Sequence, residues 1–137
     1  MVYSARLEVS TSAARQAIDI TSRLQGLVAQ SGIAEGAALV FTSHTTTGLF
    51  VNEHEAGLQE DVESVLSQLV PRAARYVHDN VDDNAASHVQ AVLLGASLVL
   101  PVTGAALDLG TWQRVFLAER DGPRRRTLVV KVIGDRP

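Results

Sequence analysis

The four histidines of the chain are its strongest candidates for chemistry, because all of them lie between positions 44 and 88. They are His44, His54, His78 and His88, and the sequence contains no cysteine. Without thiolates, imidazole is the side chain best suited to bind zinc or a similar divalent ion. His44 ends an apolar segment, whereas His78 and His88 flank a polar one. A shared metal site for these three and unrelated polar roles for each both remain open, while His54 begins an expected helix and stands apart.

Other polar residues could take part in the same chemistry. Asn52 and Glu53 precede an expected helix, and three roles are open to the Glu53 carboxylate. It is a general base, a partner of a ligating histidine, or an acid that the helix dipole favours at this position. The arginines at 124–126 either grip phosphate groups or lie in a solvated hairpin. The acidic residues of the polar segment lack the calcium-loop spacing, so they fit solvated turns as well as a cation site. They are Asp79, Asp82 and Asp83.

Length and composition indicate one folded domain over residues 1–137. The chain has 137 residues, of which 46% are hydrophobic and 20% charged, a balance that excludes disorder of the whole chain. The formal charge of −3 argues against a general nucleic-acid binder. No signal peptide is visible, and the most apolar stretch, residues 91–102, is too short to cross a bilayer. We therefore expect a cytoplasmic protein with neither nucleic acid nor membrane as a partner.

The elements that must position these side chains follow from the hydrophobic pattern. Alternation and short apolar runs predict six strands, over residues 2–9, 37–43, 49–51, 98–102, 114–119 and 127–133. Apolar residues at three- and four-residue steps predict two main helices, over residues 13–30 and 55–69, and residues 87–95 fit a shorter one. The polar segment over residues 72–87 shows no regular pattern. The order predicts an α+β fold with a mixed, β-sandwich-like core.

Several motifs of the chain resemble those of the YjbQ family, which is described as a secondary thiamine-phosphate synthase family. The most specific are Ser97-Leu-Val-Leu-Pro-Val-Thr-Gly104 and Leu109-Gly-Thr-Trp-Gln-Arg-Val115. The resemblance extends over essentially the whole chain, and Gln90-Ala91-Val92 replaces the family's usual Lys-Ser-Ser after the last histidine. The further matching segments are His44-Thr45-Thr46, Asn52-Glu53, Tyr76-Val77-His78-Asp79, Ser87-His88, Leu94–Ser97, Glu119 and Asp121–Arg124 with Arg126.

The resemblance implies a homotrimeric, metal-dependent transferase with a weak activity. That activity couples hydroxymethylpyrimidine diphosphate to a thiazole phosphate and releases pyrophosphate. A divalent zinc or magnesium ion would bind His44, His78 and His88, and the catalytic residues would be Glu53, Asn52 and Glu119. Residues that bind the phosphorylated or heteroaromatic substrate would be Thr45, Thr46, Trp112, Gln113, Arg124 and Arg126. The alternative is a non-catalytic trimer that binds a metabolite or a structural ion. An open coordination position would distinguish the enzyme from this alternative.

Overall fold

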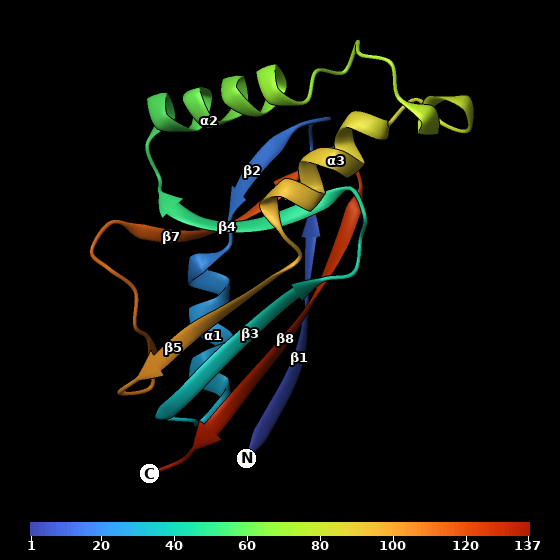
Figure 1. Cartoon of the computed structure of the whole chain (residues 1–137). Coiled ribbons are helices and arrows are strands. Elements are labelled where there is room, and N and C mark those ends of the chain that lie inside the picture. Colours follow the sequence, from blue (N-terminus) through green and yellow to red (C-terminus); the bar gives the residue numbers. More distant parts are fainter.

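Two antiparallel sheets form the core of the computed structural model, which describes residues 1–137 (Figure 1). The larger sheet has the strand order β1-β8-β3-β5-β6, and the smaller has the order β2-β7-β4. The predicted α+β fold is confirmed, and every strand pair in it is antiparallel. The strands are β1 (Val2–Ser10), β2 (Gln16–Asp19), β3 (Glu35–Thr42), β4 (Thr47–Glu53), β5 (Ser97–Thr103), β6 (Ala106–Leu107), β7 (Gln113–Glu119) and β8 (Arg125–Asp135).

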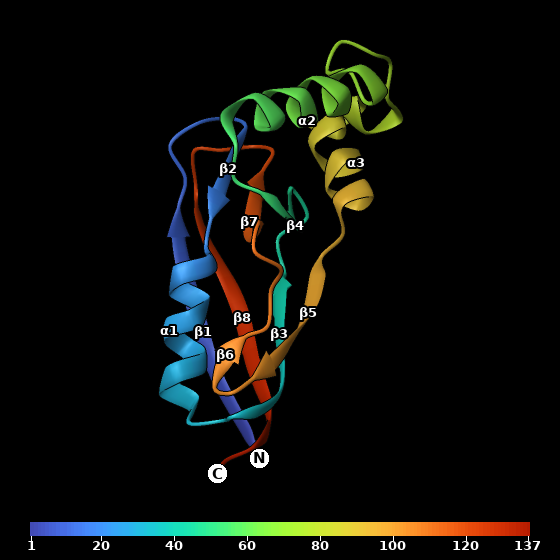
Figure 2. The same ribbon diagram turned by 90° about the vertical axis from the view of Figure 1, so that its left-hand side faces the viewer.

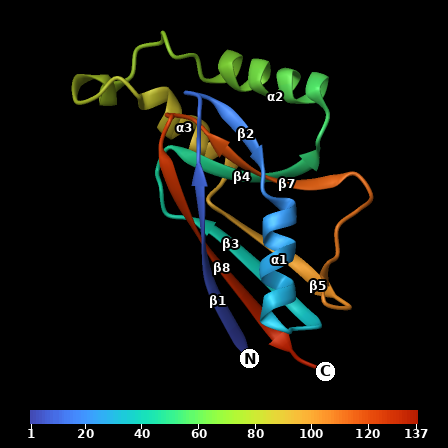
Figure 3. The same ribbon diagram turned by 180° about the vertical axis from the view of Figure 1, so that it is seen from behind.

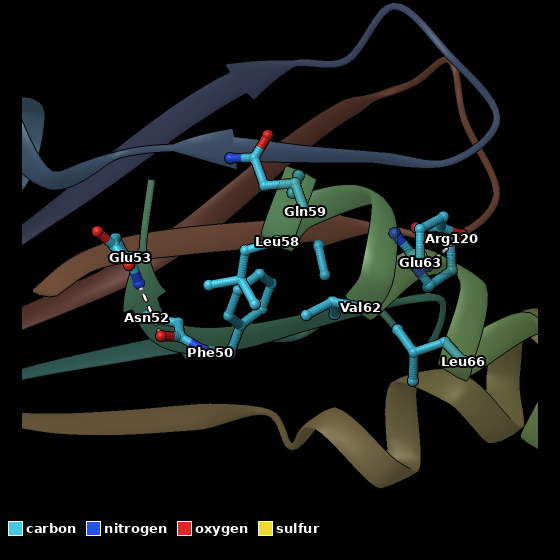
Figure 4. Close-up of a pocket in the computed structure, with 11 residues that line it drawn as sticks. Phe50, Asn52, Glu53, Leu58, Gln59, Val62, Glu63, Leu66 and Arg120 are labelled. Atoms are coloured by element: carbon cyan, nitrogen blue, oxygen red, sulfur yellow. Dashed lines mark hydrogen bonds and ion pairs between the residues drawn. The ribbon is translucent and has the colours of Figure 1, made fainter. Parts of the chain in front are cut away.

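The helices lie at the sides of these sheets. α1 (Thr21–Ser31) runs along one face of the larger sheet, as Figures 2 and 3 show from two sides. α2 (Ala56–Leu69) lies across one face of the smaller sheet (Figures 1 and 4), and it is followed by a 3₁₀ turn, η1 (Val77–Asn80), and α3 (Ala85–Leu94). None of these helices is long and apolar enough to cross a membrane.

The core lies between α1 and the two sheets. The interior strand β8 alternates between buried and less buried residues up to Val132, so Leu128, Val130 and Val132 are all fully buried. They belong to one hydrophobic cluster together with Leu24 of α1 and Leu117 of β7. Because both sheets and α1 contribute to this cluster, the ends of strands from the two sheets are held in fixed positions relative to each other.

The prediction of a helix over residues 13–30 is wrong in its first part. Residues 16–19 form β2, which pairs with β7 between Gln16 and Glu119 and between Asp19 and Phe116. The helix begins at Thr21, whose backbone N–H and hydroxyl both donate to the carboxylate of Asp19. Four residues are too few to distinguish a strand from a helix by apolar spacing, and the open edge of β7 decides the outcome.

The other predicted helix, over residues 55–69, is confirmed as α2. The carboxylate of Glu55 accepts hydrogen bonds from the N–H groups of Gly57 and Leu58 and so caps the helix, and this lowers the pKa of Glu55. No residue of α2 is fully buried, and Val65 and Leu69 are exposed. α2 therefore packs against the rest of the chain along one narrow stripe only.

α3 contacts the smaller sheet through a close approach at Gly48 of β4. A Cβ atom at this position would lie 2.6 Å from the Cβ atom of Leu94. Only glycine permits this contact, which places the beginning of β4 beside α3. The helix expected over residues 87–95 thus exists, and it begins slightly earlier, at Ala85.

Candidate functional site

A groove of about 450 Å³ lies where the β3–β4 turn, the beginning of α3 and the β7–β8 hairpin meet. We call it the polar groove, because no hydrophobic residue lines it. Figure 1 shows these three segments on the same side of the molecule. Its lining residues are Ser43, His44, Thr45, Thr46, Asp82, Asn84, His88, Asp121, Arg124 and Arg126.

A second groove, of about 550 Å³, continues from the first along α3. We call it the mixed groove, because Phe41, Ala91 and Val92 line it beside polar residues. The two grooves share the segment Ser43–Thr45 and the imidazole of His88. A compound with an anionic end and a flat apolar part could place the anionic end in the polar groove and the apolar part in the mixed groove.

The floor of the polar groove rests on a buried ion pair between Arg126 and Glu119. The guanidinium donates to the carboxylate from both Nε, at 2.8 Å, and Nη2. The carboxylate also accepts from the Thr11 hydroxyl at 2.7 Å and the Asp121 backbone N–H at 3.0 Å. Burial alone would raise the pKa of Glu119, but these hydrogen bonds outweigh it and lower that pKa. Glu119 is therefore ionised and fully buried.

This ion pair determines which groups of the floor can reach a ligand. Arg126 also donates from Nη2 to the hydroxyl of Thr46 at 2.9 Å, so Nη1 is its only nitrogen without a protein partner. Glu119 lies behind the arginine and contacts no groove, so it positions Arg126 instead of touching a substrate. Thr46 is buried and has the same positioning role, whereas Thr45 is exposed at the groove.

His44 is neutral in this arrangement. Its Nε2 accepts the backbone N–H of Thr127 at 3.0 Å, so the ring proton resides on Nδ1. Burial lowers the pKa of His44, and the nearby positive charge of Arg126 lowers it further. The ring therefore offers a ligand one N–H donor and no free lone pair.

His78 and His88 lie in direct contact. Their ring centroids are 4.9 Å apart, and the rings meet edge to face. Nε2 of His78 lies 3.1 Å from Oδ1 of Asn84, and the amide of Asn84 donates to Asp121 at 3.0 Å. This chain of contacts assigns the proton of His78 to Nε2 and leaves Nδ1 bare. No protein group hydrogen-bonds to the ring of His88, so both of its nitrogens are free for a ligand or a proton.

Not all three of the predicted histidines are suited to bind one metal ion. No three histidine, aspartate or glutamate side chains are grouped closely enough to hold one ion. His44 does not fit as a ligand, because its only lone pair accepts the Thr127 N–H. His78 and His88 remain candidates, because their ring centroids lie 4.9 Å apart and Nδ1 of His78 and both ring nitrogens of His88 have no protein partner.

Arg124 adds a positive charge at the rim of the polar groove. Its Nε donates to the carbonyl oxygen of Asp121 at 2.9 Å, and its Nη2 donates to the carboxylate of Asp121 at 3.0 Å. More than half of the arginine side chain is exposed. The guanidinium is thus held in place by its neighbour while one side of it faces solvent.

The remaining predicted site residues lie at the opposite end of the smaller sheet. The pair Thr47–Glu119 is at the histidine end of β4 and β7, and the pair Glu53–Gln113 is at the other end. The two ends of β4, Thr47 and Glu53, are six positions apart, or about 20 Å of extended strand. Asn52, Glu53, Trp112 and Gln113 are all exposed there, so the structure does not bring them to the histidines within one chain.

Asn52 and Glu53 instead line a small cavity beneath α2 (Figure 4). Its volume is about 20 Å³, close to what one water molecule needs. Phe50, Leu58, Val62 and Leu66 are the larger apolar side chains of its wall. The amide oxygen of Asn52 accepts the backbone N–H of Glu53 at 2.8 Å. This cavity is too small for a metabolite.

His54 also lies at that end, as predicted for the histidine outside the set. Its Nδ1 is 2.8 Å from the carboxylate of Asp19, which also accepts from Nε of Arg114 at 2.8 Å. Burial raises the pKa of Asp19, but the hydrogen bonds led by Arg114 outweigh it and hold that pKa far below its usual range. The cluster joins β2 and β7 to the residue that follows β4, and none of its members lines the grooves.

Sequence reasoning missed two kinds of residue, one at the grooves and one beside them. Asn84 and Asp121 orient His78 and Arg124, but amides and carboxylates in turns carry no signal of their own. Arg120 is buried next to Glu119, and here a signal existed, because two charged residues directly follow the apolar run over residues 115–118.

Comparison with known proteins places the chain in a family. It matches the family model described as UPF0047 protein YjbQ-like over residues 5–135. It is 47% identical over 133 residues to a UPF0047 protein of Methanothermobacter thermautotrophicus, covering 97% of this chain and 93% of that protein. A UPF0047 protein of Archaeoglobus fulgidus is 44% identical over 127 residues, covering 93% of this chain and 98% of that protein.

Solved structures agree with these matches. A YbjQ-like protein of unknown function from Sulfolobus solfataricus superimposes with a TM-score of 0.96 at 39% identity, covering 98% of this chain and 99% of that one. A YjbQ/UPF0047 family protein from Clostridium acetobutylicum gives a TM-score of 0.90 at 36% identity, covering 94% of this chain and 99% of that one. Sequence and fold therefore agree with the resemblance of the motifs, and the chain belongs to the YjbQ-like UPF0047 family.

Proposed function

We propose that this protein is an enzyme acting on a small phosphorylated metabolite with a heteroaromatic part, bound across the joined grooves. The observation that carries the proposal is that His44 and His88 lie on both a wholly polar groove and a partly apolar one. A phosphate group fits the polar groove, where Arg124 and Arg126 supply positive charge. A ring fits the mixed groove against Phe41 and Val92.

The reaction that suits this arrangement is the coupling implied by the family motifs. A bond forms between the thiazole nitrogen and the methylene carbon of the pyrimidine, while the bond from that carbon to the diphosphate oxygen breaks. The departing diphosphate gains negative charge. The Nδ1–H of His44, Nη1 of Arg126 and Arg124 are donors available to stabilise that charge. His88, which lines both grooves and has no protein partner on its ring, would contact the substrate or a bound ion.

For the metal, the proposal differs from the three-histidine set. His78 and His88 would hold a divalent ion, and His44 would remain a hydrogen-bond donor. Imidazole ligands favour zinc over magnesium. A bound ion would supply Lewis-acid stabilisation of a phosphate oxygen.

We also propose that the chain assembles into a homotrimer. Apolar side chains are exposed on and beside α3, including Val77, Val81, Val89, Val92 and Leu93. Such a group on a chain of this size is typical of a protein interface. Light scattering at micromolar concentration tests this, and a monomeric mass would contradict it.

The test of the function is turnover of the two precursors, measured as released pyrophosphate and thiamine phosphate. We expect H88A to lose the activity, because its imidazole lines both grooves. H54A is the matched control, since His54 is an exposed histidine outside the grooves, and it should keep the activity. If wild type binds the phosphorylated precursors without turnover, the alternative of a non-catalytic metabolite-binding protein is correct.

A further inference from the structure

A separate cavity of about 110 Å³ lies beside the polar groove. It is bounded by the segment before β2, the residue after Pro71, the beginning of α3 and the turn after β7. It shares only Asn84 and Asp121 with the polar groove. Its lining residues are Ala14, Arg15, Arg72, Asp83, Asn84, Ala86, Ser87, Arg120, Asp121 and Gly122.

Arg120 is the residue of this lining that calls for an explanation. Only 2% of its side chain is exposed, and its Nη1 donates to Glu63 at 3.0 Å and to Gln90 at 3.4 Å. Its Nε is buried without any partner, and it is the single such side-chain atom in the chain. Nη2 makes no hydrogen bond to protein either. The Nε–Nη2 edge therefore has no protein partner, and Arg120 lines both this cavity and the small cavity beneath α2. An arginine edge of this kind binds an oxyanion with two parallel hydrogen bonds.

Two further arginines of the lining have no acidic partner. Arg72 makes no ion pair, and Arg15 only donates from Nη1 to the hydroxyl of Ser67 at 3.3 Å. Of the two carboxylates, Asp121 is already paired with Arg124. Three guanidinium groups thus face a cavity in which Asp83 is the one carboxylate without an ion pair.

The first turn of α3 adds donors to the same cavity. The cap residue Asn84 makes no side-chain hydrogen bond to the helix, and the N–H groups of Ala86 and Ser87 have no acceptor in the chain. Unpaired N–H groups and the helix dipole at this end both favour a negative charge. Both residues line the cavity.

We propose that this cavity binds a tetrahedral oxyanion, namely a phosphate group, between Arg120 and the beginning of α3. The volume is several times the roughly 15 Å³ that one water molecule needs, so the cavity has room for more than a single water. Phosphate uses both the planar fork of an arginine and the N–H groups of a helix end. The site is distinct from the grooves and does not depend on the function proposed for them.

Titration of the ¹⁵N-labelled full chain with inorganic phosphate tests this site directly. We expect saturable amide shifts at Ala86 and Ser87 with a millimolar dissociation constant. The double variant R15Q/R72Q should weaken this binding at least ten-fold while its other amide signals stay in place. R75Q is the matched control, because Arg75 is exposed in the same segment and does not line the cavity.

A second pair of measurements separates this site from the grooves. H44A alters the polar groove at a residue that does not line the cavity, and it should leave the phosphate-induced shifts at Ala86 and Ser87 within two-fold of wild type. Methyl phosphate in place of phosphate shows whether the cavity takes the end of an ester as well as the free anion. The proposal is overturned if these two amides do not respond to phosphate, or if R15Q/R72Q binds it as wild type does. Failure of turnover in the groove experiment would leave this result untouched.

Discussion

Replacing Glu119 with glutamine should strongly destabilise the fold. The carboxylate is fully buried and accepts hydrogen bonds from Arg126, Thr11 and the backbone of Asp121. A glutamine amide presents one NH₂ group to these donors and leaves the Arg126 charge uncompensated. Removing one partner of a buried ion pair costs about 3–5 kcal/mol. This is a large share of the roughly 5–15 kcal/mol that stabilises a typical domain.

Urea denaturation followed by circular dichroism measures the effect. With a slope of about 2 kcal/mol/M, a loss of 3–5 kcal/mol lowers the urea midpoint by about 1.5–2.5 M. The double variant E119L/R126M removes both charges and should recover most of the loss, because no charge is then buried alone. E8Q is the matched control, since Glu8 forms a long, exposed pair with Arg125 at 3.9 Å, and it should unfold like wild type.

The pH dependence provides a second check of the same reasoning. The folded-state pKa of Glu119 is depressed, so its stabilising effect is present above the unfolded value of about 4.3 and is lost as the pH falls through the folded value. E119Q should therefore show a flatter stability profile below about pH 4 than wild type. An E119Q midpoint within about 0.3 M of wild type would refute the buried, charged pair.

Three further predictions concern the histidines and α3. An NMR titration should give His44 a midpoint below the ordinary value of about 6.5, since burial and Arg126 disfavour its charged form; a midpoint above it would contradict the Thr127 contact. Metal analysis of zinc-loaded protein should show loss in H88A and retention in H44A, and equal loss in both would restore the three-histidine site. G48A should lower the melting temperature, because the new methyl group meets Leu94, and an unchanged value would mean that α3 shifts freely.

The sequence pattern predicted most of the fold because most elements have a clear period. β1, α2 and β8 carry long alternating or helical patterns, and each lies within a few residues of its predicted range. β2 could not be predicted, since four residues fit either period and the edge of β7 determines their conformation. Two-residue β6 is likewise formed only by its pairing with β5.

The candidate site was predictable in its residue types and only partly in its geometry. The motifs identified His44, His78, His88, Arg124 and Arg126, and all five line or adjoin the polar groove. Residue spacing cannot show that the Thr127 N–H occupies the His44 lone pair, because that contact joins positions 83 residues apart. Nor could it show that Glu53 lies at the far end of the strand that begins beside the histidines.

The Glu119–Arg126 pair also has a consequence for folding. It joins β7 and β8 to Thr11, 108 positions from Glu119, and to Thr46, 80 positions from Arg126. Contacts between such distant positions form only after both sheets have come together. A partly folded chain therefore has no floor for the polar groove, and a compound that binds there selects the fully folded state. Such a compound would raise the stability of the whole domain and would reduce the population of aggregation-prone, partly folded chains.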